Sequence, residues 1–255
     1  MKFLATAHTD IGNVKKTNQD SAFVKIVDTS EYGEIAFAAV CDGMGGLEKG
    51  EIASSNAVRM LMDWFESFSS RGYIKSSLNE IGAELTRLIK EENSKISDYG
   101  SRYDVTLGTT LTALLLIKNE YLIVHVGDSR VYQLTNAVEQ LTEDQTFIAR
   151  EIKRGTMTPE QAKTDPRRNM LLQCVGASKN VVPELVTGRI AEDSVFMLCS
   201  DGFRHVISND EIYESFNYRT LRNKEAMDTN AQYLIDTVKS RNERDNITVV
   251  LIKCM

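Results

Sequence analysis

One short stretch constrains the fold of this chain more than any other: Val40-Cys41-Asp42-Gly43-Met44-Gly45-Gly46. An apolar run over residues 35–40 ends there at an aspartate, and three glycines follow within the next four residues. Because glycine has no Cβ, the backbone beyond the aspartate can adopt positive φ and approach a bound ion or anion closely. An Asp-Gly pair after a strand is more often an ordinary turn, so this stretch alone does not define a site.

The same arrangement, an apolar β-rich run with an aspartate at its edge, occurs four times in all. The aspartates are Asp42 after residues 35–40, Asp128 after 121–126, Asp201 after 194–200 and Asp245 before 247–252. If these strands lie side by side, the four carboxylates gather along one rim of a sheet. Acids in such a cluster repel one another, which raises their pKa values unless cations lie among the oxygens.

Composition limits the class of protein. The chain has 255 residues, of which 42% are hydrophobic, so it can bury a large core, and we expect a single domain over residues 1–255. Its net charge is −6 and no block of Lys and Arg stands out, which argues against a nucleic-acid partner. We expect a monomer.

The cysteines and the hydrophobic runs indicate a compartment. Four cysteines, without C-x-x-C spacing and mostly inside apolar runs, are expected to be buried thiols. No run reaches the roughly 18–20 residues of a membrane span, and the first residues lack the apolar core of a signal peptide. We therefore expect no membrane partner and a cytoplasmic location, although a domain cut from a larger membrane protein would look the same.

Hydrophobic periodicity predicts the elements. We expect strands at 3–7, 22–27, 35–40, 108–117, 121–126, 131–134, 181–190, 195–199 and 247–252, and helices at 47–68, 78–96, from 158, from 208 to 216 and around 231–238. Residues 118–120 and 127–130 are interpreted as hairpin turns. This order favours two antiparallel sheets packed face to face with helices outside them, a layered α+β domain. The polar stretch at about 143–180 is interpreted as a flap-like insert over one edge of the sheet.

Six spaced motifs carry a resemblance to a known family. They are Asn18-Gln19-Asp20, Asp42-Gly43-Met44-Gly45-Gly46, Gly108-Thr109-Thr110, Gly127-Asp128-Ser129-Arg130, Ser200-Asp201-Gly202 and Asp245-Asn246. In order and spacing they resemble the metal-dependent protein phosphatases of type 2C, over residues 9–252, and most closely the compact bacterial members. The resemblance implies a four-layer α-β-β-α fold, in which helix pairs flank a central antiparallel β-sandwich with a two-metal site at one end.

The resemblance also implies a role for each site residue. Asp42 would bridge two cations, Gly43 would contribute its backbone carbonyl, and Asp201 and Asp245 would complete the shell of the first ion. Asp128 would hold a weaker third ion, and Asp20 would act from the outer shell. Independently of the family, a cluster that offers only oxygen donors favours Mn²⁺ or Mg²⁺.

The predicted reaction follows from that site. Two cations can activate a water molecule for direct attack on a phosphate ester, so no covalent phospho-enzyme is needed. Cys41 and Cys199 are then interpreted as residues of the hydrophobic core and not as nucleophiles. By resemblance the substrates would be proteins phosphorylated on serine or threonine, and the chain would oppose a bacterial Ser/Thr kinase.

Two positions depart from the family pattern. Lys15 stands where many members have an arginine that grips the phosphate, and lysine lacks the planar bidentate fork of arginine. A solvated surface lysine is the competing interpretation. Met44 stands where eukaryotic relatives have a histidine suspected of protonating the leaving group, and methionine cannot donate that proton.

Other functions and roles remain open at this point. Two alternatives are a non-catalytic binding or regulatory module built on the same fold and a calcium-binding structural domain, although no D-x-[DN]-x-[DN]-G loop occurs. His8, His125 and His205 are interpreted as structural. Arg130 is expected to brace the metal loops, and Asp165 is interpreted as an exposed acid of the insert.

Overall fold

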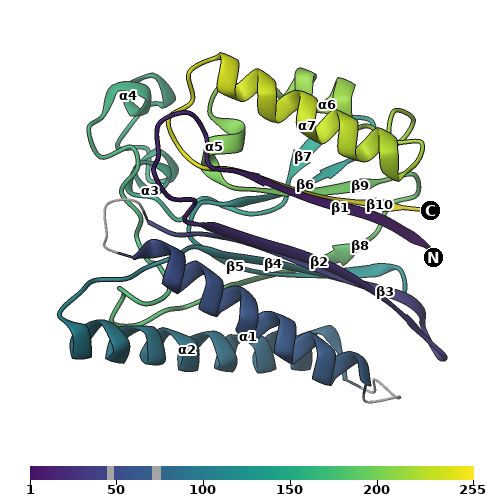
Figure 1. Ribbon diagram of the computed structural model, residues 1–255, viewed down its shortest axis with the longest axis horizontal. Coiled ribbons are helices and arrows are strands. Elements are labelled where there is room, and N and C mark those ends of the chain that lie inside the picture. The colour runs from purple at the N-terminus through teal and green to yellow at the C-terminus, as the bar shows by residue number, and fades with distance from the viewer. Residues whose placement is uncertain (45–48, 71–75) are drawn as a thin grey trace.

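A computed structural model of the chain describes residues 1–44, 49–70 and 76–255. Two five-stranded antiparallel sheets lie face to face at its centre (Figure 1). The first sheet has the order β2 (Asp20–Thr29), β3 (Gly33–Asp42), β4 (Leu111–Ile117), β5 (Glu120–Val126) and β8 (Glu184–Arg189). The second has the order β1 (Phe3–Asp10), β10 (Ile247–Cys254), β9 (Val195–Cys199), β6 (Arg130–Leu134) and β7 (Val138–Gln140).

Helices cover the outer face of each sheet. The first sheet is covered by α1 (Gly50–Ser70) and α2 (Leu78–Tyr103), and the second by α5 (Asp201–Arg204), α6 (Asn209–Phe216) and α7 (Lys224–Ser240) (Figure 1). The insert contributes α3 (Phe147–Lys153) and α4 (Pro159–Thr164) at one end of the sandwich. The predicted layered α+β fold around an antiparallel sandwich is confirmed.

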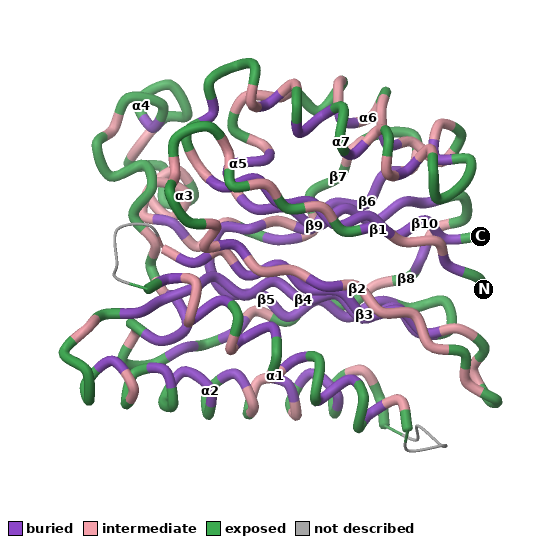
Figure 2. Tube along the Cα trace, viewed as in Figure 1, coloured by how far each residue is buried: buried purple, intermediate pink, exposed green. Residues whose placement is uncertain are grey.

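Strand β3 shows why the central strands are apolar without interruption. Its side chains alternate between two buried environments: Phe37 and Cys41 face α1 and α2, while Ala38 and Val40 face the second sheet. A strand buried on both faces loses the polar alternation of a surface strand. Figure 2 shows the result as buried traces through both sheets, with exposed residues at the outer turns of the helices.

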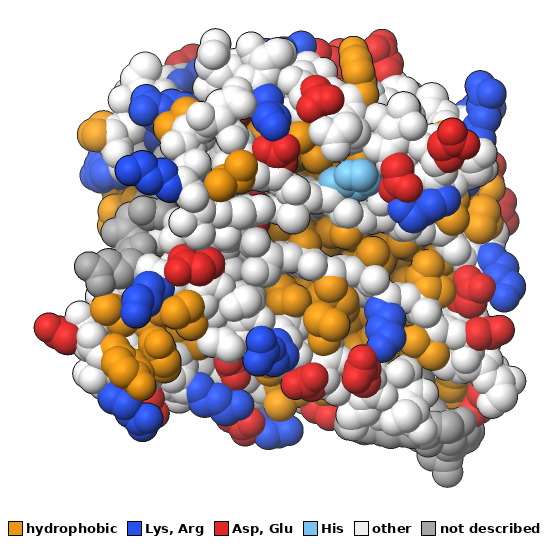
Figure 3. Space-filling model, viewed as in Figure 1, with side chains coloured by type: hydrophobic (Ala, Val, Ile, Leu, Met, Phe, Trp, Pro, Cys, Tyr) orange, Lys and Arg blue, Asp and Glu red, His pale blue; other side chains and the backbone are white. Residues whose placement is uncertain are grey.

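The sandwich is less completely covered along the edge strands β1 and β2. Figure 3 shows hydrophobic side chains at the surface across the middle of the face where these two strands run. Ala22, Val24 and Ile26 of β2 and Ala5 of β1 are partly buried against the core between the sheets. In the described part of the chain, no helix combines the length and hydrophobicity that crossing a membrane requires.

One predicted connection is wrong. Residues 127–130 do not form a hairpin, because β5 pairs with β4 and β8 in the first sheet, whereas β6 pairs with β7 and β9 in the second. The segment instead carries the chain from one sheet to the other. A short link between two strands therefore does not ensure that they pair, and this crossover brings Asp128 to the end of the sandwich.

Other boundaries differ by a few residues. The strand predicted at 181–190 is shortened to β8, because the side-chain amide of Gln173 takes both backbone groups of Val182, with bonds of 2.8 and 2.9 Å. The strand predicted at 108–117 begins at Leu111. The helix predicted from Leu47 is described from Gly50, since residues 45–48 lie outside the described part. The three-residue β7 and the four-residue α5 are too short to show a periodicity.

The insert is built from short, locally capped helices. Thr158 and Gln161 form a capping box at the predicted start of α4, with Pro159 at the first helical position. The apolar residues Phe147, Ile148 and Ile152 are only partly buried, and α3 buries none of its residues completely. The helices of the insert therefore bury fewer residues than α1, α2 and α7 do.

Candidate metal centre

The ends of β2 and β3 place two aspartates at one end of the first sheet. Antiparallel pairing sets Asp20 opposite Asp42. The N–H of Asp42 donates to Thr110 Oγ1 at 2.9 Å, and its carbonyl accepts from the N–H of Thr110 at 2.8 Å. The backbone that carries the Asp42 carboxylate is therefore fixed on one side by pairing with β2 and on the other by the two hydrogen bonds to Thr110.

Asp201 and Asp245 come together in the second sheet. Ser200 continues the pairing of β9 with β10: its N–H donates to the Thr248 carbonyl, and its Oγ accepts from the Thr248 N–H, both at 3.1 Å. A Cβ at Gly202 would collide with the Asn246 carbonyl oxygen and would lie 3.1 Å from Asp245 Cβ. Glycine after Asp201 is therefore needed for these two acidic segments to approach.

Asp128 reaches the centre from the crossover between the sheets. Gly127 has φ of +110°, and a Cβ there would lie 2.6 Å from Thr110 Cγ2, so the crossover needs glycine both for its conformation and for space. Ser129 Oγ lies 2.8 Å from Thr110 Oγ1, the oxygen that accepts from Asp42. Thr110, part of the Gly-Thr-Thr motif, thus links the end of β3 to the crossover.

Three of the five aspartates, Asp20, Asp42 and Asp128, have raised pKa values. Burial is the main reason that the pKa of Asp42 lies well above its usual value, and repulsion from the other four adds to it. Burial, then the charges of Asp201 and Asp245, raise the pKa of Asp20 to about 6. Burial and the charge of Asp201 raise the pKa of Asp128 to about 7, although Arg204 offsets part of the rise. These segments, from both sheets, therefore converge on one acidic centre.

Several of these oxygens have no partner among the residues that the structure describes. Both carboxylate oxygens of Asp20 and Oδ1 of Asp201 are buried there without a hydrogen bond. The hydroxyls of Ser200 and Thr248 lie near enough to Asp20 to lower its pKa in part, but not in the geometry of a hydrogen bond. Buried, unpartnered carboxylates are costly in a folded protein, and divalent cations would satisfy them and favour their ionised forms.

The chemistry of this donor set fits Mg²⁺ or Mn²⁺, which prefer oxygen ligands. In the described residues, no three His, Cys, Asp or Glu side chains already surround one point closely enough to hold an ion. Asp245 is instead bound to Lys15, whose Nζ lies 2.6 Å from Asp245 Oδ1. Burial works against the charge on Lys15, but the bond to Asp245 and the charges of Asp42 and Asp201 raise its pKa.

The glycine motif is described in part. The Gly43 N–H donates to the Gln19 carbonyl at 3.1 Å, and a Cβ at Gly43 would lie 2.5 Å from the carbonyl oxygens of Gln19 and Gly50. Met44 is partly buried and its N–H donates to the Gly108 carbonyl at 3.0 Å. Gly45 and Gly46 lie outside the described residues. The motif thus brings three backbone segments into close contact beside Asp42.

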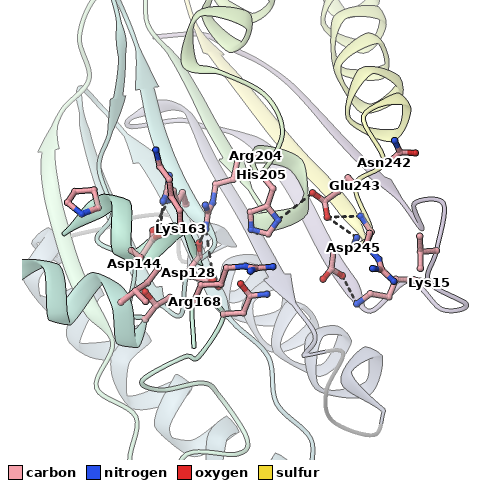
Figure 4. A pocket seen from close by; sticks show the side chains of 18 residues that line it. Lys15, Asp128, Asp144, Lys163, Arg168, Arg204, His205, Asn242, Glu243 and Asp245 are labelled. Carbon is pink, nitrogen blue, oxygen red and sulfur yellow. Dashed lines mark hydrogen bonds and ion pairs between the residues drawn. The ribbon is translucent and has the colours of Figure 1, made fainter. Parts of the chain in front are cut away.

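His205, expected to be structural, lies beside the acidic centre. It lies on the pocket wall, with its ring nitrogens 3.5 Å from Asp201 Oδ2 and from Glu243 Oε2 (Figure 4). Burial opposes its protonation, but Glu243 and Asp201 raise its pKa. His125, in contrast, is fully buried between Thr112 and the Glu143 carbonyl, as a structural histidine should be.

Arg130 braces the crossover as expected. Its guanidinium makes two 2.7 Å bonds to Asp144, while Arg204 lies 3.6 Å from Asp144 and donates to the Asp128 carbonyl at 3.1 Å. No sequence motif contains Arg204, Asp144 or Glu243, so these residues were not predicted at the site. Asp165 pairs with Arg167 inside the insert, with an Nη2–Oδ2 distance of 2.7 Å.

A pocket of about 720 Å³ lies between the insert and the loop before β10, and its lining includes Arg130, Asp144 and Arg204 (Figure 4). Asp128, Asp144, Lys163 and Arg168 lie on one side of it, while Lys15, Glu243 and Asp245 lie on the other, with Arg204 and His205 between them. A phosphorylated side chain entering this pocket would meet both the acidic centre and several cationic groups.

Comparisons with known proteins agree with this arrangement. The family model for Protein phosphatase 2C matches residues 12–240. The serine/threonine phosphatase stp of Listeria monocytogenes serotype 4b is 32% identical, over 98% of this chain and 95% of the relative. A solved S. agalactiae serine/threonine phosphatase is 29% identical, with a TM-score of 0.84 over the whole of both chains. The catalytic domain of the serine threonine protein phosphatase PstP, solved in complex with two manganese ions, is 28% identical, with a TM-score of 0.78 over 98% of this chain and 97% of that one.

Proposed function

The chain belongs to the protein phosphatase 2C family, and we propose that its buried aspartate cluster holds the divalent cations on which its activity depends. As a member of that family it is a protein serine/threonine phosphatase whose activity requires metal. The observation that carries the proposal is the convergence of five aspartates from both sheets, several of whose oxygens are buried without a partner in the described part of the chain. A binding module without catalysis has no need to crowd unpaired acids in this way.

Each residue of the acidic centre would have its own role in binding metal. Asp42, Asp201, Asp245 and the Gly43 carbonyl would ligate two cations, Asp128 would contribute to a third, and Asp20 would orient groups from the outer shell. Two manganese ions in the PstP relative support the expected number and the choice of Mn²⁺. The chemistry that such cations supply is activation of a water molecule for in-line attack on phosphorus.

The chain's own cations would receive the phosphate. Lys15 lies beside Asp245 and borders the pocket, so its ammonium can contact a phosphate oxygen there. Arg130 and Arg204 are bound to Asp144 and to the Asp128 backbone, and therefore hold the walls of the site. Met44 cannot donate a proton to the leaving alkoxide, which leaves that task to solvent. We further propose that the natural substrates are those of a cognate Ser/Thr kinase.

The direct test is hydrolysis of a phosphothreonine peptide with Mn²⁺, with EDTA, and by the Asp201→Asn variant with Mn²⁺. EDTA should abolish turnover, and Asp201→Asn should cost more than the roughly 10- to 100-fold that loss of an outer-shell group costs. Asp98→Asn, a change to an exposed acid of α2, is the matched control and should retain full activity. Turnover that survives both EDTA and Asp201→Asn would refute the metal-centre proposal.

A further inference from the structure

Three cationic side chains border the pocket without an acidic partner. Lys163 of α4, Arg168 just after it and Arg244 before β10 all line the pocket, and all three are exposed. Within the described part of the chain, none of them forms an ion pair or a side-chain hydrogen bond. Exposed cations without a partner are free to bind a ligand that enters from solvent.

The acids of the same pocket are already engaged. Asp144 is bound by Arg130 at 2.7 Å, Asp245 by Lys15 at 2.6 Å, and Glu243 faces His205 at 3.5 Å. Cations bound in the metal centre would occupy the aspartates further. The mouth of the pocket therefore has an excess of positive charge, although the whole chain carries −6.

Arg167 and Arg168 are neighbours in the sequence but have different contacts. Arg167 makes a two-bond ion pair with Asp165, at 2.9 and 2.7 Å, and its guanidinium lies 4.1 Å from the centre of the Phe147 ring. It therefore stabilises the insert and does not line the pocket. Arg168, one residue on, makes no such contacts and borders the pocket (Figure 4).

The cations flank the pocket on two sides. Lys163 and Arg168 belong to the insert, whereas Arg244 lines the pocket from the loop before β10, where its sequence neighbours Glu243 and Asp245 lie on the opposite side (Figure 4). Figure 3 shows several Lys and Arg side chains over the part of the surface where Figure 1 places α3 and α4. A phosphorylated residue bound in the pocket would therefore have cationic groups near the chain on both of its sides.

We propose that this rim, defined as Lys163, Arg168 and Arg244, selects phosphoprotein segments that carry Asp or Glu on both sides of the phosphorylated residue. The proposal rests on the proposed phosphatase activity and names its substrate class. Complementary charge at the edge of a binding site increases the association rate and disfavours segments of like charge. The metal centre and Lys15 serve the phosphate itself, which leaves the rim for the flanking residues.

The test compares three phosphothreonine peptides that differ only in their flanking residues, which are Glu, Gln or Lys. With Mn²⁺ at low salt, we expect kcat/KM to be about tenfold higher for the Glu peptide than for the Gln peptide, and lowest for the Lys peptide. Since exposed charges are screened by salt, the Glu-to-Gln ratio should shrink towards one at about 0.5 M NaCl.

Variants then assign the preference to the rim. Lys163→Gln, Arg168→Gln and Arg244→Gln should each lower the Glu-to-Gln ratio about two- to threefold, and the triple variant should bring it close to one. Lys179→Gln removes the same charge from an exposed lysine that does not line the pocket, and should leave the ratio and the basal activity unchanged.

The outcomes separate the two proposals. Equal turnover of the three peptides would overturn the rim proposal while upholding the phosphatase activity. An equal loss of preference in Lys179→Gln would also overturn it, because net charge and not the rim would be responsible. Absence of turnover with every peptide would refute the proposed function, and the rim proposal with it.

Discussion

Lys15 is the single residue whose role depends most on what fills the acidic centre. Its ammonium binds Asp245, one of the proposed ligands, at 2.6 Å, and its side chain is only 28% exposed. A divalent cation that binds Asp245 has to compete with this ion pair. In the proposed metal centre, Lys15 would therefore hinder entry of metal and, once displaced from Asp245, would contact the substrate phosphate.

Replacing Lys15 should separate these two effects. In Lys15→Gln we expect Mn²⁺ to bind several-fold more tightly, because the competing charge is gone, while KM for a phosphothreonine peptide rises about three- to tenfold through loss of a charge-assisted contact. Calorimetric titration with Mn²⁺ measures the first effect and steady-state kinetics the second. Lys16→Gln, a change to the neighbouring lysine outside the pocket lining, serves as the control. Weaker Mn²⁺ binding in Lys15→Gln would contradict the competition.

At the scale of elements, the helices of the body and those of the insert are capped alike but supported differently. Asn223 Oδ1 accepts from the Ala226 N–H at 2.8 Å at the start of α7, and Thr158 Oγ1 accepts from the Gln161 N–H at 3.2 Å at the start of α4. Yet α7 buries five side chains against the second sheet, whereas α4 buries only Ala162. Loss of a cap should therefore have different consequences in the two places.

We expect Asn223→Ala to lower the free energy of unfolding of the whole protein by about 1 kcal/mol. Thr158→Ala should leave global stability nearly unchanged and should speed amide exchange only within the insert, because a weakly buried segment opens locally. Thermal unfolding and hydrogen exchange, measured on both variants, distinguish the two cases. A global loss from Thr158→Ala equal to that from Asn223→Ala would show that the insert unfolds together with the body.

On the scale of the whole molecule, the acidic centre makes the stability of the metal-free protein depend on pH. Asp128 has a folded pKa of about 7, above its usual 3.8, and the pKa of Asp42 is raised still more clearly. A group with a raised folded pKa holds its proton more tightly in the folded state, so the stability it contributes is lost as the pH rises through that pKa. His205, whose pKa is also raised, acts in the same direction.

The protein in EDTA should therefore become less stable between pH 6.5 and 8. Asp128 alone should account for about 1 kcal/mol, or roughly 2–4 °C in Tm. His125, whose pKa is lowered to about 4, opposes the trend by only about 0.4 kcal/mol, because it is neutral in the folded state and its unfolded form, half protonated at pH 6.5, loses that proton over this range. Differential scanning calorimetry with EDTA and with Mn²⁺ measures the effect, and Asp128→Asn should flatten the slope.

Added Mn²⁺ should reverse the trend, since ligand carboxylates must be ionised to bind metal. At about a hundred times its dissociation constant, a bound ion adds about 2.7 kcal/mol. A Tm in EDTA that stays level or rises from pH 6.5 to 8 would contradict the account of the acidic centre.

The sequence by itself determined the local features of this protein. Repeated apolar runs that end in Asp42, Asp128, Asp201 and Asp245 predicted both the strands and the acidic cluster, because a strand's periodicity and its terminal residue are encoded in neighbouring positions. The helix starts at 158 and 208 were predicted for the same reason, and both are capped by the side chain at that position. The spacing of the six motifs led to the family, and through it to the four layers.

Only the tertiary structure decided which distant segments meet. It assigned β5 and β6 to different sheets, so that residues 127–130 became a crossover where the sequence predicted a hairpin. It also brought Glu243 and Arg204 to the pocket and placed His205 beside Asp201. Of the two neighbouring arginines, Arg168 lines the pocket, whereas Arg167 forms an ion pair with Asp165. These outcomes depend on packing and charge between segments far apart in the chain, which no local pattern of residues records.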